Sequence, residues 1–182
     1  MITEVEPNSI TIINILSACS DLANLPRGQQ IQAYAARRFS PLEFDLSLAN
    51  AFITMYATSG SEQGAENIFR TLQERNTISW NAMISGYATN GSSADAIQAF
   101  MDMLEEGFQP NGVTFLSVLS ACHHGVLIRK GLQIFSFMVR DMKLTPQLAH
   151  YGCIVDLLVR GGFLQEAREF INSMPVEPDA SI

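Results

Sequence analysis

A short phrase occurs twice in this chain, and its repetition constrains the fold more than any other feature. Residues 15–19 read ILSAC, and residues 118–122 read VLSAC. Nine residues after each cysteine comes a glycine, Gly28 or Gly131, followed by a helix-like apolar run. Segments that repeat at a long fixed distance are typical of a stack of similar structural units. The function of such a chain is expected to follow from the surface of the stack.

A shorter period lies between the two phrases. Residues 56–60 and 87–91 are nearly identical and start 31 positions apart. A small residue followed by apolar residues three, four and seven positions later also recurs, and this spacing is one face of an α-helix. The small residues that begin this pattern are Gly28, Ala65, Ala96, Gly131 and Ala167.

Each unit also contains an earlier apolar stretch, such as residues 51–56, 82–87 or 154–158. Proline recurs between units, and because proline lacks an amide donor and stops helices, it suits a boundary. Each unit is therefore predicted to fold as helix, turn, helix, and the chain as an all-α solenoid. A turn with glycine follows each first stretch, at Gly60, Gly91, Gly125 and Gly161–Gly162.

Composition limits the class of protein. The hydrophobic content of 47% over 182 residues is enough for one continuous core. No apolar run reaches the roughly 18–20 residues that span a bilayer, and the N-terminus has no signal or transit character, so no membrane association is expected. Three widely spaced cysteines, Cys19, Cys122 and Cys153, indicate core packing rather than disulfides. The net charge of −7 argues against strong non-specific binding to nucleic acid.

The units resemble the pentatricopeptide repeat family, in particular the plant subclass in which standard, long and short repeats alternate. Residues 77–84, TISWNAMI, with Pro110 and Asn111 resemble the standard repeat, and the Leu-x-Ala-Cys phrase resembles the long one. Residues 150–158 and 174–179 resemble the short repeat that closes such arrays. The resemblance covers essentially the whole chain, which we expect to be an internal or C-terminal segment of a longer protein.

This resemblance implies the following division. Residues 1–8 would be the tail of a preceding repeat, 9–45 a long repeat, 46–76 a short one, 77–111 a standard one, 112–147 a long one, 148–179 a short terminal one, and 180–182 the start of a following segment.

The family implies a right-handed superhelix that binds single-stranded RNA at about one base per repeat. Members of this subclass are similar to factors that select sites for C-to-U editing in mitochondria or chloroplasts. Zinc deaminases need His-x-Glu and Cys-x-x-Cys, and neither occurs in this chain. His123 and His124 lack a third metal ligand at suitable spacing. We therefore expect no enzymatic activity, cofactor or metal in this segment.

In this family the fifth and the last residue of a repeat contact the edge of the base. Those pairs are Asn50 with Asn76 and Asn81 with Asn111. An amide offers both a donor and an acceptor, and the family code implies that an Asn pair selects a pyrimidine, with cytosine slightly preferred. The alternative is that these asparagines only cap helices or form turns.

The second residue of a repeat implies a sandwich around the base. Ile78 and Val113 would bracket the base held by Asn81, whereas the short unit has Ser47 at this position and should hold its base less firmly. An ordinary half-exposed aliphatic residue is the alternative for each.

The long and terminal units depart from the code. The long units pair Ile13 with Asp45 and Leu116 with Gln147, and an aliphatic side chain cannot form a hydrogen bond with a base. These units are predicted to be spacers or docking surfaces for partner proteins. The last unit pairs Gly152 with Asp179, so that Asp179 is its one side chain that could contact a base.

Phosphate contacts are expected to be few. The thirteenth residue of many such repeats is Lys, but here only Arg160 is a permanent cation and His124 could contribute when protonated. Weak RNA affinity is therefore expected for this segment alone. The other residues at this position are Asp21, Thr58 and Thr89.

A protein-binding scaffold is the second hypothesis. Tetratricopeptide-like repeats bind peptides with the same architecture, although their Trp-x-x-Leu-Gly phrase is missing and Trp80 stands in a Trp-Asn step instead. Both roles can coexist, because the long units are similar to those that dock small organellar editing cofactor proteins. Apolar terminal repeats could also allow self-association.

Overall fold

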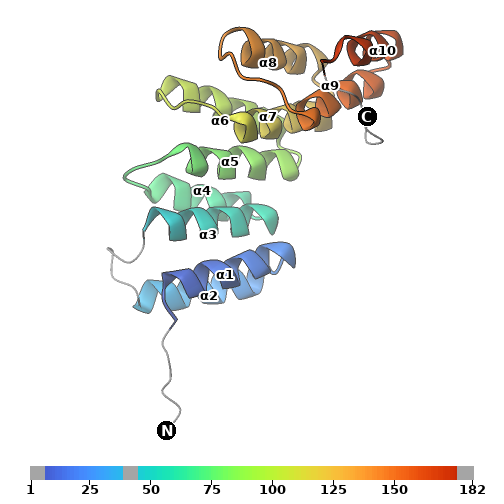
Figure 1. Cartoon of the computed structure of the whole chain (residues 1–182). Coiled ribbons are helices and arrows are strands. Elements are labelled where there is room, and N and C mark those ends of the chain that lie inside the picture. Colours follow the sequence, from blue (N-terminus) through green and yellow to red (C-terminus); the bar gives the residue numbers. More distant parts are fainter. Residues whose placement is uncertain (1–6, 39–44, 176–182) are drawn as a thin grey trace.

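The computed structural model describes residues 7–38 and 45–175, and these residues form ten helices and no strand. The helices form hairpins that stack in chain order (Figure 1). The predicted all-α solenoid is thereby confirmed. The helices are α1 (Ser9–Asp21), α2 (Leu25–Arg38), α3 (Leu46–Thr58), α4 (Glu62–Thr71), α5 (Thr77–Thr89), α6 (Ser93–Glu105), α7 (Gly112–His124), α8 (Ile128–Arg140), α9 (Leu148–Arg160) and α10 (Leu164–Ser173).

A polar residue precedes the first helix of every hairpin. The side chains of Asn8, Asp45, Asn76 and Asn111 each accept a hydrogen bond from a backbone N–H three residues later. Such a cap satisfies one of the N–H groups that a helix leaves free at its start. Four of the five first helices therefore begin directly after a side-chain cap; the bounds of the five repeats and their division into long, short and standard types stay predictions.

The fifteenth residue of each hairpin, in the turn between its two helices, has a positive φ. Glycine supplies this conformation at Gly60, Gly91 and Gly162, with φ near 80°. In the fourth hairpin it is Val126 (φ 52°), and the preceding Gly125, expected from the sequence to make the turn, remains right-handed. A β-branched residue is rare in this region. The two hairpins without glycine here, the first (Ala23) and the fourth, contain the repeated cysteine phrase.

Small residues allow the two helices of a hairpin to pack against the next hairpin. The small residues predicted to begin the second-helix pattern are all buried. A Cβ atom added to Gly28 would lie 2.2 Å from Sδ of Met55, and one added to Gly131 would lie 2.4 Å from Cδ2 of Leu157. A Cβ atom at these positions would therefore force the side chains of Met55 and Leu157 in the next hairpin to shift.

The cysteines pack in the core as expected. Cys19 and Cys122 are buried, Cys153 is partly buried, and all three are free thiols. Burial raises the pKa of Cys122 and of Cys153 to about 11. The thiols of Cys122 and Cys153 are therefore protonated near neutral pH and poorly reactive.

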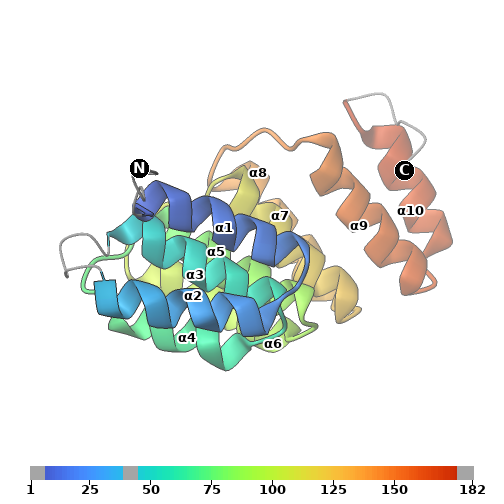
Figure 2. The same ribbon diagram turned by 90° about the horizontal axis from the view of Figure 1, so that it is seen from below.

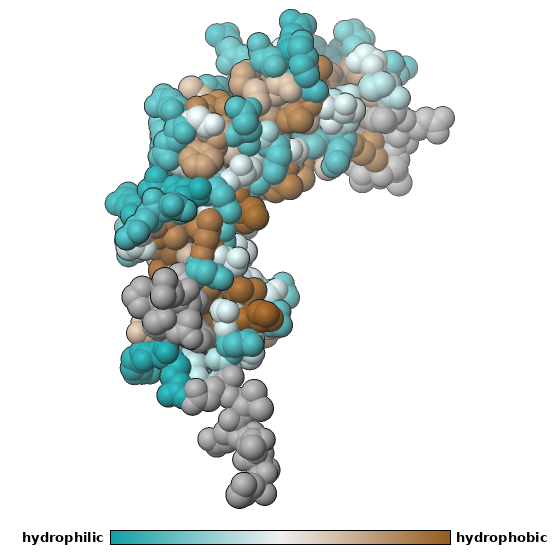
Figure 3. Space-filling model, turned by 60° about the vertical axis from the view of Figure 1, so that its left-hand side comes forward, coloured by the Kyte–Doolittle hydropathy of each residue, from teal (hydrophilic) through white to brown (hydrophobic). Residues whose placement is uncertain are grey.

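The stack curves because its two layers are spaced differently. Each first helix contacts the next one, from α1 to α9, whereas the described second helices do not contact one another. The more closely spaced first helices therefore lie on the inner side of the arc, whose outline Figure 3 shows; Figure 2 views the same stack from below. We call α1, α3, α5, α7 and α9 the inner row. Among the described residues, no helix is long and apolar enough to cross a membrane.

Candidate nucleic-acid interface

The middle of the inner row carries no Lys, Arg, Asp or Glu. Helices α3, α5 and α7 consist only of apolar, small and neutral polar residues, apart from the two histidines that end α7. The net charge of −7 therefore resides elsewhere in the chain. Because long-range repulsion of phosphate depends on where the charge lies, this acidic balance is a weaker argument against RNA than the sequence alone suggested.

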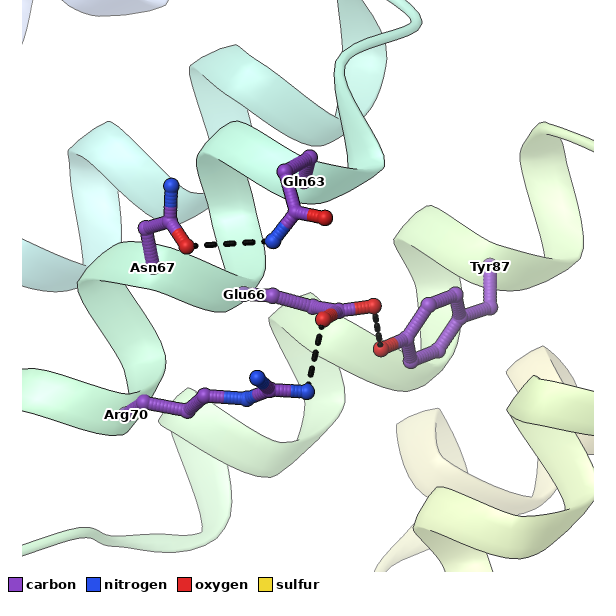
Figure 4. A network of polar contacts seen from close by, with 5 residues as sticks. All are labelled: Gln63, Glu66, Asn67, Arg70 and Tyr87. Atoms are coloured by element: carbon purple, nitrogen blue, oxygen red, sulfur yellow. Dashed lines mark hydrogen bonds and ion pairs between the residues drawn. The ribbon is translucent and has the colours of Figure 1, made fainter.

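Charged side chains gather instead on the second helices. Arg70 forms an ion pair with Glu66 on α4 at 2.9 Å, and the Tyr87 hydroxyl of α5 donates a hydrogen bond to the other oxygen of Glu66 at 2.9 Å (Figure 4). Burial and then the bond to Glu66 raise the pKa of Tyr87 above its ordinary value. These contacts tie α4 to α5 and occupy the charged groups with one another.

A cavity of about 400 Å³ opens on the inner row between α3, α5 and α7. It is lined by four of the residues predicted to hold one base: Ile78, Asn81, Asn111 and Val113. Ile78 is 63% exposed and Val113 is 58% exposed, so two aliphatic side chains project into solvent on neighbouring helices. The volume falls in the lower range of sites that bind small ligands. The remaining lining residues are Thr54, Ala57, Thr58, Ala82, Ser85, Gly86 and Thr89.

A closed set of hydrogen bonds joins Asn81, Asn111 and Thr114. The Thr114 hydroxyl donates to Oδ1 of Asn81 at 2.6 Å, and Nδ2 of Asn81 donates to Oδ1 of Asn111 at 3.2 Å. Oδ1 of Asn111 also accepts from the Thr114 backbone N–H at 3.1 Å, while the Asn111 backbone N–H donates to the Thr114 hydroxyl at 3.0 Å. Asn111 therefore caps α7, as the alternative interpretation held, and lines the cavity as well.

The equivalent residues one hairpin earlier are connected differently. Asn76 caps α5, and its Oδ1 accepts from the backbone N–H of Ser79 at 3.0 Å and from the Ser79 hydroxyl at 3.1 Å. Asn50 is buried, and its Oδ1 has no hydrogen-bond partner within the described part of the chain. Ser47, which stands where Ile78 stands in the next hairpin, is exposed.

The long units contribute no pair of polar side chains to the inner row. Ile13 and Leu116 are half-buried, and Asp45 caps α3 through the backbone N–H of Leu48 at 2.8 Å. Gly152 of the last unit is also half-buried, and its predicted partner Asp179 lies outside the described residues.

His150, which the sequence interpretation passed over, fixes the start of α9. Its Nδ1 accepts from the backbone N–H of Gln147 at 2.9 Å, and its Nε2 lies 2.8 Å from the carbonyl oxygen of Gly112. Because Nδ1 accepts, the ring proton is on Nε2, which donates to the Gly112 carbonyl oxygen. Gln147 therefore belongs to a helix start that is tied to α7.

The residues at the thirteenth position form a line along one edge of the inner row. They are the last residues of the five first helices, and all of them are exposed. The rings of His123 and His124 lie 5.1 Å apart. Burial, followed by Arg160 and His124, lowers the pKa of His123. Arg160 and His124 thus lie at the C-terminal end of this edge. Among the described residues, no cluster of side chains is suited to bind a metal ion.

Two segments of the chain match family models. Residues 75–124 match the model described as the PPR repeat family, and residues 149–177 match the PPR repeat model. The first segment includes α5 and α7, which line the cavity. The second includes all but the first residue of α9, in the hairpin that follows the cavity.

Long relatives in Arabidopsis thaliana match nearly the whole chain. One pentatricopeptide repeat-containing protein is 44% identical over 95% of this chain and 22% of its own length. Another, named as chloroplastic/mitochondrial, is 42% identical over 97% of this chain and 28% of its own length. The chain thus spans about a third or less of the length of the curated relatives it matches.

Solved structures share the fold. The pentatricopeptide repeat protein PPR10 in complex with an 18-nt psaJ RNA element superposes with a TM-score of 0.82 at 22% identity, over 93% of this chain and 25% of that one. The PPR domain of the Arabidopsis thaliana protein-only RNase P 1 in complex with tRNA gives a TM-score of 0.68 at 11% identity, over 90% and 87%. At these identities the likeness establishes the solenoid architecture.

Proposed function

We propose, from the premise that this chain belongs to the PPR repeat family, that its inner row binds single-stranded RNA in a sequence-specific manner. The observation that carries the proposal is the convergence of Ile78, Asn81, Asn111 and Val113 on one cavity in an uncharged surface. In this proposal the cavity holds one base. Each hairpin with a polar pair contacts one base, and the hairpins that lack such a pair contact none.

The chemistry of the cavity suits a flat, partly apolar ligand with a polar edge. Ile78 and Val113 would cover the two faces of the base, since they project from neighbouring helices. The amides of Asn81 and Asn111 would meet its Watson–Crick edge chiefly with N–H donors, because both amide oxygens already accept hydrogen bonds. A pyrimidine, with cytosine slightly preferred, is the expected ligand of this pair.

Affinity for RNA should be low for this segment alone. Arg160 and His124 are the predicted phosphate contacts, and both lie toward one end of the inner row. With one or two phosphates neutralised, the logarithm of the affinity should fall with the logarithm of salt concentration with a slope of about −1.

In the cell, the segment would contribute to a longer RNA-processing factor in mitochondria or chloroplasts, with selection of C-to-U editing sites as its role. The printed names of several relatives include chloroplastic or mitochondrial, which supports this location. Catalysis would be supplied by other parts of the machinery.

A second role is proposed for the long units. Ile13 and Leu116 place half-buried aliphatic side chains at the positions where other hairpins have Asn. Such positions suit docking of small organellar editing cofactor proteins. At the two ends of the stack, Ile10 and Leu22 on the first hairpin and Leu164 on the last are more than 60% exposed, and they could support self-association.

The proposal is tested by titrating the chain with labelled RNA hexamers rich in C, U, A or G, and following the shift of its NMR signals. Weak binding with a preference for pyrimidines is expected, and Asn81→Ser should change the base preference at one position. Asn67→Ser on the exposed face of α4 is the matched control and should change nothing. Tight binding that is blind to sequence at physiological salt would contradict the proposal, as would an unchanged preference in the Asn81 variant.

A further inference from the structure

The two asparagine pairs of the inner row have the same residue types but different hydrogen-bond partners. The third residue of the next inner-row helix is Thr114 for the site of Asn81 and Ser79 for the site of Asn50. The Thr114 hydroxyl donates across the helix boundary to Asn81 Oδ1 at 2.6 Å. The Ser79 hydroxyl donates to the cap, Asn76, and Asn50 Oδ1 has no partner among residues 7–38 and 45–175.

The hydroxyl of Thr114 has one proton, and its surroundings decide where that proton goes. Thr114 is fully buried, so no solvent competes for it. Oδ1 of Asn111 lies at 3.2 Å from this hydroxyl but already accepts from the Thr114 backbone and from Asn81. The shorter bond to Asn81 Oδ1 therefore takes the proton.

This arrangement fixes which end of the Asn81 amide faces which neighbour. If the amide were turned by 180°, its oxygen would face Oδ1 of Asn111, and two acceptors would lie together without a proton between them. Its nitrogen would then face the Thr114 hydroxyl, which would lose its nearest acceptor. The two facing oxygens, and the longer 3.2 Å bond to Oδ1 of Asn111 that would remain for the Thr114 hydroxyl, make this orientation the less favourable one. At Asn50 no equivalent bond favours one orientation.

We propose that Thr114 is a positioning residue for base selection: it holds the Asn81 amide in one orientation, so that this site distinguishes cytosine from uracil, whereas the Asn50 site does not. The inference rests on the proposed RNA-binding function and deepens it by naming what sets the specificity of one site.

The base preference follows from the N–H groups of Asn81 and Asn111 that are left without a partner in the site. With both oxygens engaged by donors, the site offers chiefly N–H groups: the second N–H of Asn81 Nδ2 and the amide nitrogen of Asn111. Cytosine presents acceptors at O2 and N3 on its Watson–Crick edge, and these match N–H donors. Uracil has an N–H at position 3, which would meet a donor. A turned amide would offer its oxygen to that N–H and would favour uracil.

The test uses four RNA hexamers in which the two central bases are CC, CU, UC or UU within adenosines. They are titrated into the chain and followed by NMR, which reports weak binding. For the unaltered chain we expect a preference of roughly tenfold for cytosine at one central position and below about twofold at the other, since tenfold corresponds to about one hydrogen bond.

Three variants separate positioning from simple helix capping. Thr114→Val is nearly isosteric, lacks the hydroxyl, and should reduce the cytosine preference to below about twofold. Thr114→Ser retains the hydroxyl and should keep the preference. Ser79→Ala loses the same kind of cap hydroxyl one hairpin earlier, where that hydroxyl bonds to the cap Asn76 and, among the described residues, not to Asn50, and it should leave the preference at the Asn81 site unchanged. Circular dichroism checks that each variant folds; should Thr114→Val not fold, Thr114→Cys, a weaker donor, should give an intermediate preference.

The outcomes are distinct. A cytosine preference in Thr114→Val equal to that of the unaltered chain would overturn the inference, as would an equal loss in Ser79→Ala. Failure of the unaltered chain to bind any of the four RNAs would overturn the proposed function and this inference together.

Discussion

The sites around Asn81 and Asn50 show that the same pair of residues can be placed in two different environments by a repeat protein. Asn81 has partners for both ends of its amide and lines a cavity between two exposed aliphatic side chains. Asn50 is equally buried, but its oxygen has no partner in the part of the chain that the structure describes, and the exposed Ser47 precedes it on the same helix. The identity of the polar pair is therefore insufficient to describe a site. The second and third residues of the adjoining inner-row helices also decide whether the amides have fixed partners and whether aliphatic side chains flank them.

The largest expected difference between the two sites is the loss of folding stability when the Asn of each is replaced by Leu. Asn81→Leu removes two hydrogen bonds and deprives the buried Thr114 hydroxyl of its nearest acceptor, so the free energy of unfolding should fall by about 1–3 kcal/mol. Asn50→Leu only replaces an unpartnered buried oxygen by a side chain of similar size and should change it by less than about 0.5 kcal/mol. Urea unfolding of both variants measures the difference, and equal losses would break the comparison.

The exposed residues Ile78 and Val113 should differ in the number of bases that they contact. Ile78 lies on the helix between the two sites and would touch both bases, whereas Val113 would touch only the base at Asn81. Ile78→Ala should therefore weaken RNA binding about tenfold and Val113→Ala about threefold, in line with the apolar area each removes. Titration with a pyrimidine hexamer checks the order. A stronger effect of Val113→Ala would place the base elsewhere.

The smallest expected effect is a gain of RNA affinity when the Asn50 site is altered to resemble the Asn81 site. Ser47→Val gives the Asn50 site the exposed aliphatic side chain that it lacks, and RNA affinity should rise about threefold. Ser17→Val, at an exposed position of α1, is the control for added apolar surface and should leave affinity unchanged. An equal gain in both variants would show that the effect is non-specific.

Much of the architecture follows from local sequence, because caps and apolar periodicity act over a few residues. The small residues that begin the second-helix pattern were predicted in this way, and capping was the stated alternative for Asn76 and Asn111, whereas the caps at Asn8 and Asp45 were not predicted. The left-handed turn residue Val126 could not be predicted, because glycine is the residue that normally indicates this conformation and Gly125 stands beside it.

The organisation of the candidate site was less accessible to prediction. The bond from Thr114 to Asn81 joins residues 33 positions apart, and its existence depends on how closely α5 and α7 pack. His150 likewise contacts Gly112 of another hairpin. The only sequence signal for Thr114 is a hydroxyl residue three positions after an Asn cap, and Ser79 has the same signal without the same bond.

The most direct test of the account is an NMR titration of the chain with a cytosine-containing hexamer in which the side-chain amide signals of Asn81, Asn111 and Asn50 are followed. The account predicts large shifts for Asn81 and Asn111, a smaller one for Asn50, and none for Asn67 on α4. Shifts confined to the second helices, or equal shifts for Asn50 and Asn81, would contradict it.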